Sequence, residues 1–298
     1  MAKKHKLKTT VLSSILELES WLKEQPQFEN RISLVPTMGA LHEGHFSLVR
    51  LAAQSSDTVI ASIFVNPLQF GPTEDFKRYP RTLEKDLLLL EKAGCDAVFT
   101  PQVEDLYFPD RSTTVIENQL SQVLCGHYRP GHFAGVTTVV LKLLNLVRPQ
   151  ILILGRKDYQ QCAILSRMMR DLNVGVRLTI SPTIREADGL AMSSRNAFLS
   201  PAERLQAPRI FGCLETLVSE WRAGETRAAV LRDHAIKRLN PRVMNSSNLA
   251  IELQYLEIVH PETLQSLDTV VPTDRAVACF AGFLGQTRLI DNLELQAL

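Results

Sequence analysis

Two histidines three positions apart, His42 and His45, lie in the segment TMGALHEGH, between an apolar run and a helix-like pattern. In open α/β sheets, ligands bind at the carboxyl ends of the strands, and the N-terminus of the next helix offers unpaired N–H groups to a phosphate. Gly39 and Gly44 let the backbone come close to such a group. We therefore predict that both imidazoles donate hydrogen bonds to one phosphate chain.

The spacing of this segment excludes three familiar motifs. A zinc-binding H-E-x-x-H helix has its histidines four apart, whereas H-E-G-H has them three apart. The P-loop pattern ends in Lys and a hydroxyl residue, where this chain has His45 and Phe46, and a G-x-G-x-x-G fingerprint is absent from the sequence. A turn that carries two incidental histidines remains the alternative.

Polar residues also follow the next apolar run, TVIASIFV. Asn66 and Gln69 offer neutral donors and acceptors suited to a small hydroxylated or carboxylated substrate, although Asn-Pro at the end of a strand is also a common turn. Further along, Arg129 and His132 in YRPGHFAG either hold a carboxylate or belong to an ordinary loop before a buried helix.

Two basic loops complete the candidate chemistry. In GRKDYQQ, Lys157 can neutralise phosphate charge, and Asp158 can bind ribose hydroxyls or cap the following helix. In DGLAMSSRN, two hydroxyls stand beside a cation, and together they can grip a triphosphate by charge-assisted hydrogen bonds: these are Ser193, Ser194 and Arg195.

The elements that must position these loops alternate between strands and helices. Apolar, strand-like runs are continuous rather than alternating, which is typical of a parallel sheet covered on both faces. We predict an α/β fold with a Rossmann-like, doubly wound parallel sheet in residues 1–183 and a smaller α+β domain in residues 184–298. The expected strands are 31–36, 58–65, 96–100, 150–154, 176–180, 253–259, 276–283 and 287–290, and the expected helices are 45–54, 83–93, 136–147 and 158–172, with mostly helical structure over 201–240.

Composition narrows the class of protein. The 298 residues are 45% hydrophobic and carry a formal charge of +1, so charge gives no support for nucleic-acid binding. The run Lys3, Lys4, Lys6 and Lys8 is expected to be a solvated terminus. Five scattered cysteines favour a reducing compartment over a disulfide framework or a zinc site. The apolar stretches are far shorter than the ~20 residues that span a bilayer, and we expect a soluble, cytoplasmic protein.

Five segments, in this order, resemble the pantoate–β-alanine ligase family: VPTMGALHEGH, SIFVNPLQFGPTEDFKRYPRT, RPGHFAGVTTVVLKLLNLVRP, GRKDYQQ and READGLAMSSRN. The match is close over residues 31–200 and follows only length and pattern beyond them. The resemblance implies an ATP-dependent ligase that condenses (R)-pantoate with β-alanine through a pantoyl adenylate, giving pantothenate, AMP and pyrophosphate. It also implies Mg²⁺ as cofactor and a homodimer, with no nucleic-acid or membrane partner.

The resemblance implies roles for individual residues. His45 is the expected proton donor, and His42, Lys157, Ser193, Ser194 and Arg195 are expected to join it in stabilising charge at the α-phosphate. Gln69 and Gln161 are expected to bind pantoate, and Gln69, Asn66, Arg129 and His132 to bind β-alanine. The expected ATP site comprises Met38, Gly39, Ala40, Leu41, His42, Glu43, Gly44, His45, Gly155, Arg156, Lys157, Asp158, Ile184, Met192, Ser193, Ser194 and Arg195.

Several alternatives stay open at the level of sequence. The family usually has an acidic residue where this chain has Arg156, which puts the ion pairing of Lys157 in question. Asp86 is the protein candidate for a magnesium ligand, alongside phosphate oxygens and water. His45 is either a proton donor or an electrostatic clamp. The rival functions are a nucleotidyltransferase acting on a phosphorylated small molecule and a nucleotide sensor without catalysis.

Overall fold

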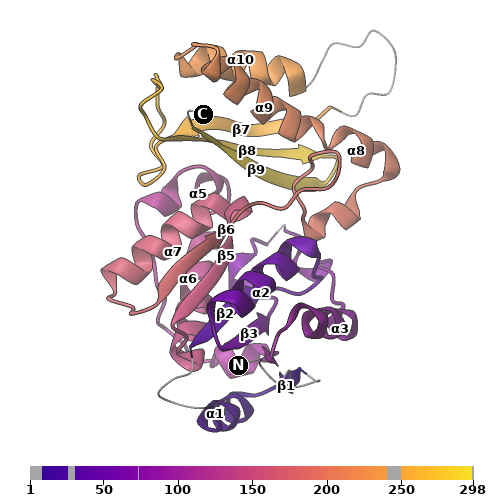
Figure 1. The fold of residues 1–298 in the computed structure, drawn as a ribbon, viewed down its shortest axis with the longest axis vertical. Coiled ribbons are helices and arrows are strands. Elements are labelled where there is room, and N and C mark those ends of the chain that lie inside the picture. The colour runs from indigo at the N-terminus through magenta and orange to yellow at the C-terminus, as the bar shows by residue number, and fades with distance from the viewer. Residues whose placement is uncertain (1–8, 26–30, 73, 240–249, 297–298) are drawn as a thin grey trace.

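The fold was analysed in a computed structural model that describes residues 9–25, 31–72, 74–239 and 250–296 (Figure 1). The predicted basic run from Lys3 to Lys8 lies outside these residues, as does Asn240 at the end of the predicted helical segment. Within the described residues, no helix is long and apolar enough to cross a membrane.

A six-stranded sheet forms the larger layer of the molecule, with the strand order β1-β4-β3-β2-β5-β6. All five strand pairings are parallel, and Leu34 on the central strand β2 pairs with Ile60 on one side and Leu152 on the other. The predicted doubly wound sheet is therefore confirmed. Its strands are β1 (Thr10–Leu12), β2 (Ile32–Thr37), β3 (Thr58–Ile63), β4 (Ala97–Phe99), β5 (Ile151–Gly155) and β6 (Arg177–Ser181).

Helices cover both faces of this sheet because its strands are apolar on both sides. One face packs against α2 and α3, with Val49 and Leu90 fully buried, and the other packs against α1, α6 and α7, with Leu18 and Ile164 fully buried. The helices are α1 (Ile15–Lys23), α2 (Glu43–Ser55), α3 (Leu83–Ala93), α4 (Val103–Leu106), α5 (Cys125–Tyr128), α6 (His132–Val147) and α7 (Tyr159–Asp171), with short 3-10 turns η1 (Pro67–Gln69), η2 (Asp75–Lys77), η3 (Leu120–Gln122) and η4 (Arg156–Asp158).

A second, antiparallel sheet lies above the carboxyl ends of the first, and α9 and α10 cover its outer side (Figure 1). Its own apolar cluster holds Trp221, Leu231 and Phe280. The predicted smaller α+β part is thus confirmed. Its elements are η5 (Ser194–Phe198), α8 (Pro201–Gln206), α9 (Arg209–Arg222), α10 (Ala228–Leu239), β7 (Glu252–Val259), β8 (Ala276–Leu284) and β9 (Thr287–Leu295).

Four elements differ clearly from expectation. Helix α6 begins at His132, four residues before the predicted start, so the RPGHFAG segment is largely helical. Strand β9 continues to Leu295 because it pairs with β8 along its whole length. The edge strand β1 and helix α1 were not predicted. The boundary at residues 183 and 184 falls between β6 and η5, and it stays a prediction.

Candidate active site

The paired histidines lie at the start of α2, where His42 is the N-cap residue. The Nδ1 atom of His42 accepts a hydrogen bond from the Gly44 N–H at 3.2 Å, and Nδ1 of His45 accepts one from the His42 N–H at 3.3 Å. The two ring centroids are 4.1 Å apart. Because both Nδ1 atoms are acceptors, each neutral ring carries its proton on Nε2. The helix terminus therefore presents two imidazole N–H donors of defined tautomer.

Burial keeps both imidazoles neutral. Desolvation, followed by the nearby Lys157 ammonium, lowers the pKa of His42 to about 4. Desolvation, the neighbouring His42 and Lys157 hold the pKa of His45 well below its ordinary value. A buried imidazole next to a cation favours its uncharged form. At neutral pH the pair can therefore donate hydrogen bonds without adding positive charge to the site.

A tight turn places this histidine segment. Gly39 and Ala40 both have left-handed backbones, with φ of 80° and 51°. The Asp86 carboxylate accepts the Ala40 N–H at 2.8 Å and the Leu41 N–H at 2.9 Å, and the Thr82 hydroxyl donates to it as well. Asp86 is only 1% exposed. The expectation that Asp86 is a magnesium ligand is therefore corrected, because its carboxylate anchors the turn.

Gly44 is required by the His42 ring. A Cβ at this position would lie 2.9 Å from both Cε1 and Nδ1 of that ring. We expect Gly44→Ala to displace the imidazole and to lower the rate of the reaction catalysed at this site about 10- to 100-fold, as misplacement of a catalytic group by about 1 Å does.

The matched control for Gly44→Ala is Gly212→Ala. This glycine also lies in a helix, and a Cβ there would meet nothing within 4 Å. Steady-state rates and thermal melting should show the control at full activity and slightly more stable, since alanine favours helices. Equal activity in the two variants would contradict the role given to Gly44.

The GRKD loop follows β5 and is fixed from the other lobe. The Asn292 side chain on β9 donates to the main-chain oxygens of Arg156 at 3.0 Å and Lys157 at 2.9 Å. The Arg156 guanidinium pairs with Glu294 at 2.6 Å, also on β9, so this cation points away from Lys157. Among the residues that the structure describes, the one carboxylate that pairs with the Lys157 ammonium is that of Asp158, at 4.0 Å. This chain has Arg156 where the family usually has an acidic residue, and the charge of Lys157 is thus left almost unpaired.

The serine-rich loop meets the histidine loop directly. The Ser194 hydroxyl donates to the Ala40 carbonyl at 2.9 Å, although the two residues are 154 positions apart. The Arg195 guanidinium makes a two-pronged pair with Asp75, at 2.8 and 3.0 Å. The Ser193 hydroxyl accepts the Arg195 N–H at 3.3 Å. These contacts hold the loop over the pocket and leave Arg195 partly neutralised by Asp75.

The amide pair predicted from sequence divides into two roles. Asn66 is 1% exposed, and its side chain uses all four of its hydrogen-bonding positions, on Gln69, Gly135, Leu68 and Tyr107. The prediction that Asn66 contacts a substrate directly is therefore corrected. Its side chain instead positions that of Gln69. The Gln69 amide accepts from Asn66 at 3.1 Å and reaches the Met38 sulfur at 2.9 Å.

The predicted carboxylate holders are engaged within the protein. The Arg129 guanidinium pairs with Glu74 at 2.5 Å. His132 Nδ1 lies 2.7 Å from the main-chain oxygen of Gln69, and burial followed by the Arg129 charge lowers the pKa of His132 to about 3. A neutral imidazole and a paired arginine are weak counter-ions for a carboxylate. Both side chains instead support the Gln69 turn.

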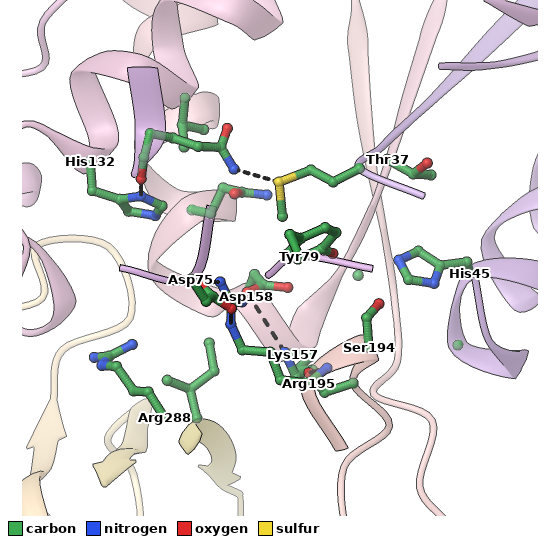
Figure 2. Close-up of a pocket in the computed structure, with 18 of the residues that line it drawn as sticks. Thr37, His45, Asp75, Tyr79, His132, Lys157, Asp158, Ser194, Arg195 and Arg288 are labelled. Carbon is green, nitrogen blue, oxygen red and sulfur yellow. Dashed lines mark hydrogen bonds and ion pairs between the residues drawn. The ribbon is translucent and has the colours of Figure 1, made fainter. Parts of the chain in front are cut away.

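A single cavity of about 470 Å³ joins these groups (Figure 2). This volume is in the range of pockets that bind small molecules. The structure therefore brings the two imidazoles, Lys157 and the serine loop to one pocket, as predicted. Of the expected site residues, those lining it are Met38, His42, Gly44, His45, Asn66, Gln69, Arg129, His132, Gly155, Lys157, Asp158, Gln161, Ile184, Met192, Ser193, Ser194 and Arg195.

Five of the expected ATP-site residues lie outside the lining. The N–H groups of Ala40 and Leu41 donate to Asp86, and that of Gly39 donates to the Thr37 hydroxyl at 3.2 Å. Glu43 pairs with Arg50 in solvent, and Arg156 pairs with Glu294. Asp158 precedes α7 but its side chain makes no capping hydrogen bond, so the capping alternative is not supported. Sequence reasoning missed lining residues whose partners are distant in the chain: Asp75, Tyr79, Gln254 and Arg288.

Known proteins match this chain along nearly its whole length. The profile of the family described as Pantoate-beta-alanine ligase matches residues 10–294. The chain belongs to the pantoate-beta-alanine ligase family. The pantothenate synthetase of Thermoanaerobacter sp. (strain X514) is 50% identical over 95% of this chain and 97% of its own. That of Thermotoga petrophila is 46% identical over 95% and 98%.

Solved structures of the pantoate-beta-alanine ligase family have the same fold. The Thermus thermophilus enzyme superposes with a TM-score of 0.88 at 42% identity, covering 97% of this chain and all of that one. The Francisella tularensis enzyme, in complex with β-γ ATP and β-alanine, superposes with a TM-score of 0.76 at 31% identity, covering 96% and 97%. The activity of this chain is therefore that of a pantoate–β-alanine ligase.

Proposed function

We propose that the pocket binds ATP and that ligation proceeds in two steps at the nucleotide's α-phosphate. The observation that carries the proposal is the convergence of two neutral imidazole donors, the Lys157 ammonium and the Ser194 loop on one cavity. A triphosphate needs both hydrogen-bond donors and positive charge along its length. The Francisella relative, with β-γ ATP and β-alanine bound, supports the same assignment.

In the first step, a carboxylate oxygen of (R)-pantoate attacks the α-phosphorus. A new O–P bond forms, the bond from that phosphorus to the bridging oxygen breaks, and pyrophosphate leaves with the electron pair. His42, His45 and Lys157 stabilise the charge that accumulates on the phosphate oxygens. No proton has to be removed from a carboxylate that is already ionised, so the neutral imidazoles act as fixed donors.

In the second step, the neutral amine of β-alanine attacks the acyl carbon of pantoyl adenylate. A C–N bond forms, the bond from that carbon to the phosphate oxygen breaks, AMP leaves with the electron pair, and the nitrogen loses a proton to water. Pantoate lies on the Gln69 and Gln161 side of the pocket, where neutral amides match its hydroxyl groups. Because Asn66 fixes the Gln69 amide, the acyl group is presented in one orientation. This arrangement favours amide formation over hydrolysis by water.

Mg²⁺ would be bound mainly by the phosphates of ATP. Among the described residues, no group of three or more metal-binding side chains stands together. The pocket carboxylates of Glu74 and Asp75 are paired with arginines, and Asp158 is the one next to Lys157. Phosphate oxygens and water therefore fit as most of the ion's ligands, with Asp158 as the protein residue that fits best. The ion would supply charge neutralisation of the triphosphate.

We also propose a cytoplasmic homodimer, as the family resemblance suggests. All five cysteines are free and buried, which suits a reducing compartment. Analytical ultracentrifugation of the full chain at micromolar concentration would give twice the monomer mass if the proposal holds.

The proposed function is tested by isotope exchange between ATP and labelled pyrophosphate. Exchange should require (R)-pantoate and proceed without β-alanine, because it reports the reversible first step, which does not use the amine. Addition of β-alanine should then release AMP and pantothenate in equal amounts. Exchange that ignores pantoate, or transfer of the nucleotide to a phosphorylated acceptor, would contradict the proposal.

A further inference from the structure

Among the residues that the structure describes, five cations line the pocket, and they differ in how far their charge is already balanced. The guanidinium of Arg129 is paired with Glu74, and that of Arg195 is paired with Asp75. Lys157 stands beside the proposed triphosphate site. A carboxylate-bearing second substrate needs a counter-ion of its own, and Arg129 is not free to serve as one.

Arg288 on β9 is a pocket cation with a neutral partner. Its Nε and Nη2 atoms donate to the side-chain oxygen of Gln254 at 2.9 and 2.8 Å. No carboxylate within the described residues pairs with Arg288 in the structure. Gln254 accepts from Nε and Nη2, and a second neutral side chain beside the guanidinium is that of Tyr255, so the charge of Arg288 stays unbalanced. Gln254 leaves unused the edge that carries one N–H from each terminal nitrogen. Two parallel N–H groups of this kind match the two oxygens of a carboxylate.

The backbone is built to hold Gln254 in place. Strands β7 and β8 pair regularly except at one point, where Leu253 faces Gly282 and Tyr255 faces Ala281. Gln254 is thus the extra residue of a β-bulge. Bulges redirect side chains and are frequent beside active sites. At this bulge, the Gln254 side chain accepts hydrogen bonds from Arg288, which lies on β9.

Arg288 lies on the opposite side of the pocket from His45 and Ser194. Figure 2 shows Arg288 and His132 on one side of the cavity, with His45 and Ser194 on the other. The Tyr128 hydroxyl donates to the main-chain oxygen of Gln254 at 2.9 Å, which ties this arginine to the segment that precedes His132. By contrast, Arg78 lies against the ring of Phe198, the last residue of η5.

We propose that Arg288, oriented by Gln254, binds the carboxylate of the amine substrate, β-alanine, during the second step. This inference rests on the proposed function and names the residue that selects an amino acid over a simple amine. The charged fork would hold the far end of β-alanine and leave its amine directed to the acyl carbon. Arg288 is then a specificity-determining residue on the second lobe.

The test compares β-alanine with its amide, 3-aminopropanamide, which keeps the amine and loses the carboxylate charge. The full-length enzyme should favour β-alanine in kcat/KM by about 10- to 100-fold, the range for a charge-assisted hydrogen-bonded pair. In Arg288→Gln, kcat/KM for β-alanine should fall by about that factor, while the amide changes less than about threefold. Arg288→Lys should lie between, since it keeps the charge and loses the fork.

Pantoate-dependent ATP–pyrophosphate exchange separates this proposal from the proposed function. Exchange should be unchanged in Arg288→Gln, and Arg170→Gln, an exposed arginine on α7, serves as the control for a lost charge. An undiminished preference for β-alanine in the variants would overturn the proposal, as would a tenfold loss of exchange, which would place the guanidinium on the triphosphate. A wild-type enzyme without exchange would instead overturn the proposed function. Arg288→Lys carries the comparison if Arg288→Gln melts early.

Discussion

Replacing Lys157 with glutamine is expected to lower the single-turnover rate of pantoyl adenylate formation by about 10²- to 10³-fold, the usual cost of removing one preorganised electrostatic group. The Lys157 side chain is 20% exposed, and its ammonium lies 4.0 Å from a carboxylate oxygen of the half-exposed Asp158. Its charge is therefore available to the phosphates. Burial beside the imidazoles also strengthens its effect, because the local dielectric is low.

The Lys157→Gln experiment needs a readout that separates chemistry from binding. Rapid-quench measurement with saturating ATP and pantoate reports the adenylation step itself. The exposed Lys92 at the end of α3 provides the control, and Lys92→Gln should keep the wild-type rate. A Lys157 variant that only raises the KM for ATP, with an unchanged single-turnover rate, would contradict a role in the transition state.

The position of Lys157 illustrates what sequence reasoning can find and what it misses. The GRKD loop is predicted from its place after an apolar strand, and the parallel sheet confirms why such a loop reaches the pocket. The loop's support is not predicted. Asn292 and Glu294 come from β9, more than 130 residues later in the chain. Period and spacing in a sequence report local structure, whereas this contact depends on how two lobes pack.

The same limit explains the corrected residues. Asp86 is a candidate metal ligand in the sequence because a carboxylate near a phosphate site suggests one. Its actual partners, the N–H groups of Ala40 and Leu41, are backbone groups that nearly every residue carries and that leave no signature. Arg129 is likewise a candidate for substrate binding, since nothing in the sequence indicates that Glu74 would face it. The types of residue in the sequence were enough to predict the pocket. The roles of Asp86 and Arg129 depend on which groups their side chains pair with in the folded protein.

The apolar pattern was sufficient for the sheet because burial on both faces leaves little choice. Ile60, Leu34 and Leu152 are fully buried in three adjacent strands, and polar residues there would lose their hydrogen bonds to water. The edge strand β1 was missed because two of its three residues are exposed. A short, half-covered strand lacks the apolar run that identifies a central one.

His45 is expected to act as a neutral hydrogen-bond donor. The adenylation rate should therefore not follow the titration of the His45 imidazole. Its pKa lies well below 6.5, and that of His42 is about 4, because burial and Lys157 disfavour the imidazolium forms. A lowered pKa favours the uncharged form of an imidazole, so both rings are uncharged around neutral pH. The kcat/KM for ATP should therefore be flat from pH 6 to pH 8, with no inflection from these rings.

Substitutions at His45 separate a donor from an acid. His45→Ala should lower the single-turnover adenylation rate about 10²- to 10³-fold, as loss of a preorganised donor does. His45→Gln should recover part of that loss, because an amide N–H replaces the Nε2–H that Nδ1 pairing fixes toward the pocket. His234→Gln, at an exposed histidine on α10, is the control and should have no effect. A proton donor would behave differently: the wild-type rate would fall as the pH rises through the pKa of His45, and this dependence would disappear in His45→Gln together with the activity. Carboxylate attack on phosphorus moves negative charge onto the leaving pyrophosphate without requiring a proton, so the flat profile follows from the chemistry as well as from the burial of the ring.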